Sequence, residues 1–70
     1  MKKYAVVYEK ASSNWAAYVP DLPGCISTGM TRSEVAQNIR EAIEFHIEGL
    51  LEDAQPIPEP SSEVDLVEIA

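Results

Sequence analysis

The sequence predicts an α+β fold in which a single helix packs on one face of a small β-sheet. Two kinds of periodicity lead to this prediction. The first residues alternate in polarity like a strand, whereas a longer central segment repeats apolar residues at the spacing of a helix. The predicted order of elements is β-β-β-α-β, which suits a two-layer sandwich. Because the chain has 70 residues, residues 1–70 are expected to form one domain.

The first two predicted strands form a hairpin. Residues 3–9 alternate between two faces, one of which carries Tyr4 and Tyr8. Residues 10–14 supply a polar turn with serine and asparagine, and residues 15–19 form the second strand. A short polar connection between two such strands is typical of an antiparallel hairpin.

A tight turn separates this hairpin from a third strand. Pro23 followed by Gly24 is the signal of a type II turn, because glycine tolerates a positive φ. Residues 25–28 then form a short strand, and Gly29 ends it.

The central helix has a clear start and an end set by proline. Thr31 and Glu34 have the spacing of a capping box, and Met30 and Val35 have that of a hydrophobic staple. The amphipathic helix is expected to be about 20 residues long. Pro56 is expected to end it, because the residue before a proline avoids the helical conformation. Its polar face comprises Glu34, Gln37, Glu41, Glu44, Glu48 and Glu52.

The last part of the chain is predicted to be extended. Residues 55–62 are rich in proline and could carry the chain back across the molecule. Residues 64–69 form the last predicted strand, at an edge of the sheet. Because one helix covers only part of a four-stranded sheet, the aromatic residues Tyr4, Tyr8 and Trp15 are expected to mark a surface for a partner, although some of them must fill the core. The chain is therefore expected to be a dimer or larger.

Composition and charge argue against several classes of function. Five basic residues stand against twelve acidic ones, which gives a net charge of −7. Because nucleic acids are bound by basic surfaces, direct nucleic-acid binding is disfavoured, and a basic protein partner fits better. The single cysteine, Cys25, excludes an intrachain disulfide. The sequence shows no signal peptide and no membrane-spanning run, so a cytoplasmic location is expected.

Candidate catalytic or metal-binding residues are few. His46 lies within the apolar stripe of the helix without a cluster of cysteines or carboxylates, so we interpret it as a packed side chain. Cys25 has Asp21 as the charged residue in its segment, which would raise the thiol pKa, so we interpret it as a buried strand residue. Asp21, Asp53 and Asp65 come from different segments and are interpreted as surface carboxylates. The sequence therefore predicts no enzymatic activity, no cofactor and no metal site.

The acidic face of the helix has two interpretations. It carries few compensating basic residues, and glutamates one turn apart, such as Glu44 and Glu48, repel each other. Phe45 projects near this face, where solvation alone would not favour an aromatic side chain. The face is either an interface with an apolar anchor and a charged rim, or an ordinary solvated surface.

Two separated segments resemble the HicB-like proteins. Residues 19–25, VPDLPGC, resemble the DLPGC signature of that family, and residues 48–61, EGLLEDAQPIPEPS, resemble its EGLLEDGEPIPEPS segment. The tyrosine-rich first strand and the helix start also match, so the resemblance covers nearly the whole chain. Ala54 and Gln55 stand where the family often has glycine, so a glycine C-cap is not available here.

The resemblance implies a partial RNase H-like topology, with sheet order 3-2-1-4 and one helix packed on the sheet. It also implies an antitoxin that binds and occludes HicA, a small basic toxin that cleaves mRNA. It does not imply RNase H chemistry, because a fold alone does not determine function. Many members carry a C-terminal DNA-binding domain, which is not expected here because the sequence stops at Ala70.

The leading hypothesis is therefore a non-catalytic antitoxin that covers the active site of a basic, HicA-like toxin. Helix glutamates would steer the toxin and pair with its Lys or Arg residues, and Phe45 and Leu22 would add apolar contact. The expected partner-binding residues are Asp21, Leu22, Pro23, Glu41, Glu44, Phe45 and Glu48. The alternatives are an orphan homo-oligomeric structural or regulatory domain without a toxin partner, and a weak metal-dependent nuclease.

Overall fold

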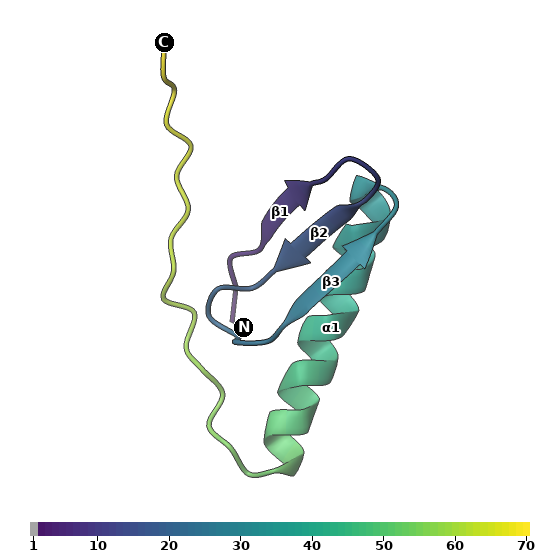
Figure 1. Ribbon diagram of the computed structural model, residues 1–70. Helices are drawn as coiled ribbons and strands as arrows, with labels where there is room; N and C mark the ends of the chain where they lie inside the picture. Colours follow the sequence, from purple (N-terminus) through teal and green to yellow (C-terminus); the bar gives the residue numbers. More distant parts are fainter. Residues whose placement is uncertain (1) are drawn as a thin grey trace.

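Three short strands form an antiparallel sheet, and one long helix packs across one of its faces (Figure 1). The computed structural model describes residues 2–70. The elements are β1 (Val7–Lys10), β2 (Trp15–Tyr18), β3 (Ile26–Gly29) and α1 (Arg32–Glu52), with the strands in the order β1-β2-β3. The α+β class, the hairpin, the third strand and the helix are confirmed, although the first strand begins at Val7 rather than at Lys3.

The sheet turns one face toward α1. Tyr8 pairs with Ala17, and Ala17 pairs with Ser27, across the three strands. Ala17 is fully buried, and Tyr4, Tyr8 and Trp15 pack against the core. All three aromatic residues are partly buried on the core side, so they fill the core, as expected for some of them, and none of them marks the uncovered face of the sheet. The buried core consists of Ala17, Val19, Leu22, Cys25, Val35 and Ile39.

The outer face of the sheet carries a different apolar row. Val7, Tyr18 and Ile26 are paired across the three strands, one position along from the buried row. Because side chains alternate along a strand, these three point away from α1. Ile26 is 62% exposed and Tyr18 is 38% exposed, so the uncovered face of the sheet is partly apolar.

The loop between β2 and β3 is held by three backbone hydrogen bonds. The Leu22 amide donates to the Val19 carbonyl at 3.1 Å, the Cys25 amide donates to the Leu22 carbonyl at 3.0 Å, and the Val19 amide donates to the Cys25 carbonyl at 3.1 Å. Gly24 has a φ of 82°, which confirms the type II turn predicted at Pro23 and Gly24. The consecutive turns fold the Leu22 side chain inward, where it is fully buried.

The start of α1 confirms the predicted cap at Thr31, and the reciprocal bond of the capping box reaches the amide of Met30, one residue before the N-cap. The Glu34 amide donates to Thr31 Oγ1 at 3.0 Å, and the Glu34 carboxylate accepts a bond from the Met30 amide at 2.8 Å. Just before this cap, Gly29 lies so close to the helix that a Cβ atom there would be 2.7 Å from the Val35 backbone nitrogen. The backbones of β3 and α1 are therefore in direct contact.

The end of α1 is a Schellman motif. The Gln55 amide donates to the Leu50 carbonyl at 2.9 Å, and the Ala54 amide donates to the Leu51 carbonyl at 3.2 Å. Ala54 has a φ of 53°, in the region that glycine favours. This motif ends the helix before the proline-rich segment is reached, so Pro56 does not itself terminate it as predicted.

The C-terminal part of the chain is extended but does not form the predicted fourth strand. It returns from the end of α1 past the start of the chain and then runs beyond the sheet (Figure 1). Residues 64–69 contain no strand, and all of residues 61–70 are exposed. The position beside β1 is thus empty among residues 2–70, and the 3-2-1-4 order and RNase H-like topology are not confirmed. Sequence pattern indicates an extended segment, but a strand also needs a neighbour to pair with.

Candidate partner-binding surface

Four of the predicted partner-binding residues lie together on α1. At about 100° per residue, Glu41, Phe45 and Glu48 fall within a sector of about 60° on the side away from the sheet, and Glu44 lies beside it. All four are exposed, and the Phe45 side chain is 78% exposed. We refer to these four residues as the acidic helix face. The helix therefore presents an aromatic ring surrounded by carboxylates to solvent.

Apart from the side of Glu44, which neighbours Lys2 and Arg40, the acidic helix face has little positive charge near it. The one ion pair found within residues 2–70 joins Lys2 to Glu59 at 2.6 Å and does not involve α1. Arg32, at the start of the helix, lies over the ring of Tyr8 at 3.4 Å from its centroid, so its charge is directed to the sheet. The face is therefore a patch of negative charge that can attract a cationic partner.

A hollow of about 220 Å³ borders this face on the side of the chain start. Its lining consists of Lys2, Tyr4, Arg40, Ile43 and Glu44. Glu44 thus shares a hollow with two basic residues of its own chain, whereas Glu41 and Glu48 do not line it. The carboxylates of Glu41 and Glu48 are accordingly the better candidates for contact with Lys or Arg of a partner.

The predicted loop residues belong to a different surface. The Asp21 carboxylate accepts hydrogen bonds from the backbone amides of Ser61 and Ser62, both at 2.9 Å, and from their hydroxyl groups. These bonds, led by the one from the Ser62 amide, hold the pKa of Asp21 below its ordinary value. Leu22 is fully buried, so the expectation that it offers an apolar contact to a partner is wrong. Pro23 is exposed.

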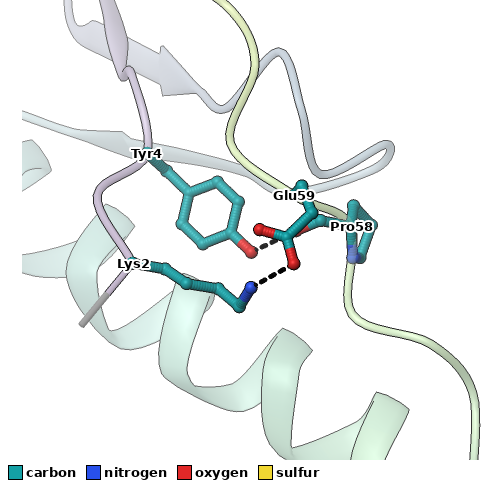
Figure 2. A network of polar contacts seen from close by, with 4 residues as sticks. All are labelled: Lys2, Tyr4, Pro58 and Glu59. Atoms are coloured by element: carbon teal, nitrogen blue, oxygen red, sulfur yellow. Dashed lines mark hydrogen bonds and ion pairs between the residues drawn. The ribbon is translucent and has the colours of Figure 1, made fainter.

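Further contacts, which no local sequence pattern indicates, tie the C-terminal segment to the start of the chain. Figure 2 shows the Tyr4 hydroxyl donating to the Pro58 carbonyl and the Lys2 ammonium group paired with Glu59. Together with the bonds to the aspartate of the loop, they fix residues 58–62 close to the chain start. The partners are 40 to 57 positions apart, which is why sequence reasoning missed them.

The remaining candidate residues include Cys25 and His46. Cys25 is 5% exposed, and burial raises the pKa of its thiol, in agreement with the interpretation of a small buried residue. His46 is half-buried on α1. In the part of the chain that the structure describes, no group of three or more His, Cys, Asp or Glu residues could hold a metal ion. No helix within residues 2–70 is long and apolar enough to span a bilayer.

Similar sequences point to one protein family. Residues 4–69 match the family model described as the HicB_like antitoxin of bacterial toxin-antitoxin system. The chain is 49% identical over 55 residues to an uncharacterized 14.9 kDa protein from the rep-hol intergenic region of Haemophilus phage HP1, covering 79% of this chain and 41% of that protein. It is 32% identical over 60 residues to antitoxin HicB 2 of Photorhabdus laumondii, covering 86% of this chain and 43% of that antitoxin. The chain thus spans less than half the length of both relatives.

A solved structure shares the fold. The chain superposes on one chain of a HicA3 and HicB3 toxin-antitoxin complex with a TM-score of 0.73 and 32% sequence identity. The match covers 86% of this chain and 70% of that chain.

Proposed function

The chain belongs to the family of HicB-like antitoxins of bacterial toxin–antitoxin systems, and we propose that it binds a HicA-like toxin and occludes the surface with which that toxin cleaves mRNA. The observation that supports this most directly is the match to a chain of a solved HicA3 and HicB3 complex, with a TM-score of 0.73. Such a role requires binding but no catalysis by this chain. It would be exercised in the cytoplasm, where the mRNA substrate of the toxin is found.

The acidic helix face is the surface that we propose meets the toxin. A protein that binds RNA carries a basic surface for the phosphate backbone, and the net charge of −7 on this chain would draw such a surface in. Glu41 and Glu48 would pair with Lys or Arg at the rim of the contact, and Glu44 would do so at the edge of the hollow that it lines. Carboxylates placed against those basic groups would deny them to RNA.

Phe45 would supply the apolar centre of the contact. Its side chain is 78% exposed in the isolated chain, so almost all of its ring is available for burial. Burying a phenylalanine side chain contributes roughly 1.5–3 kcal/mol, and aromatic anchors within a charged rim often dominate an interface. Of the loop residues, Pro23 is exposed and would be a separate contact outside the acidic helix face, whereas the Asp21 carboxylate is occupied by hydrogen bonds from the C-terminal segment.

Charge reversal on α1 tests this proposal. The double variant Glu41→Lys/Glu48→Lys is expected to slow association with the HicA-like toxin by about tenfold or more, because it replaces attraction with repulsion at the contact. The rate is measured by stopped-flow mixing of the two purified proteins, and rescue of bacterial growth during toxin expression provides a second readout.

The control for that experiment is Glu9→Lys, a change of the same sign on β1, away from the acidic helix face. The proposal predicts that this variant associates almost as fast as the unmodified chain. If Glu9→Lys slowed association as much as the double variant, the association rate would depend only on the net charge of the chain. If the double variant associated as fast as the unmodified chain, the acidic helix face would not be part of the interface.

A second candidate function is an orphan homo-oligomeric domain without a toxin. The exposure of Leu66 at 94%, of Ile69 at 82% and of Val67 at 73% favours it, because such apolar side chains are usually covered by a partner. A chain that forms a defined oligomer but binds no HicA-like toxin encoded beside its gene would support this candidate over the antitoxin.

A further inference from the structure

β1 lies at an edge of the sheet and has one unpaired side. It pairs with β2 through residues such as Val7 opposite Tyr18. Among residues 2–70, no backbone hydrogen bond from another segment reaches its other side. Such an edge presents a row of N–H and C=O groups that can accept a further strand.

The segment 63–69, which we name the C-terminal strand segment, has the composition of a strand but no partner. It runs extended away from the fold (Figure 1). Four of its seven residues are large and apolar, and their exposed fractions are 64% for Val64, 94% for Leu66, 73% for Val67 and 82% for Ile69. A contiguous apolar segment that is so exposed indicates a surface that is buried in an assembly.

Charge partly matches this segment to β1, because the basic residues on and before β1 outnumber its one acidic residue, Glu9, although Lys2 is already paired with Glu59. The acidic residues of the segment are Glu63, Asp65 and Glu68, and it has no basic residue. Three of the five basic residues of the chain lie on β1 or at the chain start that leads into it, namely Lys2, Lys3 and Lys10. β3, the other edge strand, has no charged residue. Lysines on an edge strand disfavour pairing with a second strand that carries lysines, because like charges repel. They favour pairing with a strand that carries acidic residues.

The C-terminal strand segment does not use the β1 edge of its own chain. The Asp21 carboxylate holds Ser61 and Ser62 at 2.9 Å beside the end of the sheet where β1 begins, so that edge is within reach of the following residues. Within residues 2–70, the segment nevertheless makes no backbone hydrogen bond to β1 and continues past the sheet (Figure 1). Seven extended residues span about 23 Å, which is enough to lie along the same edge of another molecule.

We propose that the C-terminal strand segment pairs with the β1 edge of a second copy of this chain, and that two copies exchange their segments around a two-fold axis. Each sheet would then contain four strands, and the outer apolar row that begins at Val7 would continue onto the exchanged segment. A two-fold exchange occupies both β1 edges and both segments, so the assembly is closed as a dimer. This inference is independent of toxin binding.

Molecular mass and proximity provide the first test. Light scattering at high micromolar concentration is expected to give twice the 7.7 kDa mass of one chain, and a monomeric mass would overturn the proposal. Glu9→Cys on β1 and Glu68→Cys in the segment are then made separately in a Cys25→Ala background and mixed with a short bis-maleimide. Cross-linked dimer that requires both variants supports exchange. A chain that carries both cysteines is also treated at high dilution, and efficient cross-linking within that single chain would show pairing with its own β1 and overturn the proposal.

Substitution of the apolar residues provides the second test. Leu66→Lys is expected to raise the dimer dissociation constant by about tenfold or more, because a buried leucine is lost from the interface. At a dilution at which both proteins are monomeric, its far-UV circular dichroism should match that of the unmodified chain, because Leu66 is 94% exposed in the isolated chain. The matched control is Leu51→Lys on α1, at a position that is 63% exposed. If Leu66→Lys left the dimer dissociation constant unchanged, the interface would lie elsewhere. The same conclusion would follow if Leu51→Lys raised the dissociation constant as much as Leu66→Lys.

Discussion

At the scale of single residues, Ala54 adopts a backbone conformation that normally belongs to glycine. Its φ of 53° brings Cβ close to a neighbouring carbonyl oxygen, which costs about 1–2 kcal/mol for a residue with a side chain. The two hydrogen bonds of the Schellman motif hold it there. HicB-like sequences often have glycine at this position. The structure shows that Ala54 adopts the positive φ that glycine would adopt there.

Ala54→Gly is therefore expected to raise the free energy of unfolding by about 0.5–1 kcal/mol, since relief of strain exceeds the added freedom of the unfolded chain. Urea denaturation measures the change. Gly24→Ala is the opposing variant, because Gly24 has a φ of 82°, and it should lower the free energy of unfolding by about 1 kcal/mol. A loss of stability in Ala54→Gly would mean that the helix end is not strained.

Asp21 makes the position of the C-terminal strand segment dependent on pH. Hydrogen bonds from Ser62 and Ser61 keep the pKa of its carboxyl below the ordinary value of 3.8. A group with a lowered folded-state pKa contributes stability above its ordinary pKa, and that contribution is lost as the pH falls through the folded-state value. Acid should therefore release Ser61 and Ser62 while the rest of the fold persists.

Amide resonances of Ser61 and Ser62 are expected to shift together as the pH falls below about 4, because protonation removes the charge from their shared acceptor. Two-dimensional NMR during an acid titration measures this. In Asp21→Asn the same resonances should lose that pH dependence. Shifts that persist in the variant would assign the transition to another carboxylate.

At the scale of elements, the parts that depend on neighbours in sequence were predictable. The capping box at Thr31 and Glu34 and the turn at Gly24 require only contacts within a few residues, and both form as expected. Whether residues 64–69 form a strand depends on whether another strand is available to pair with them. The residue pattern within the segment contains no information about that partner. The apolar side chain of Leu22 suits either the core or an interface, and the two successive turns place it in the core.

The outer face of α1 allows a prediction for the toxin complex. Phe45→Ala is expected to weaken binding of a HicA-like toxin by about tenfold to a hundredfold, mainly through faster dissociation, because an apolar anchor is lost. Surface plasmon resonance with immobilised toxin separates the two rates. Met30→Ala, at a position that is 69% exposed before the start of α1, should leave both rates unchanged. Comparable effects of the two variants would argue against a contact centred on Phe45.

At the scale of the whole molecule, the excess of acidic over basic residues is unevenly distributed. Most of the basic side chains lie at the start of the chain or over the sheet, as Lys2 and Arg32 do in their contacts with Glu59 and Tyr8. The outer side of α1 is left acidic. Composition alone indicated a basic partner, but the direction from which that partner would approach required the structure.

Association with the toxin should therefore depend strongly on salt. Raising the ionic strength from about 0.05 M to 0.5 M is expected to slow association by about tenfold or more, while dissociation changes little, because long-range attraction is screened. Stopped-flow measurements over this range give the dependence. Glu41→Lys/Glu48→Lys should reduce its slope, and a rate that is insensitive to salt would contradict electrostatic steering.

The close approach of Gly29 to the Val35 backbone has a consequence for any partner of α1. Because no side chain separates β3 from the helix at this point, the helix cannot move toward the sheet when pressed from outside. A protein docking on the outer face of α1 would meet a surface that is already in its final position. Little of the binding free energy would then be lost in ordering the helix, so even a small contact area could support tight binding.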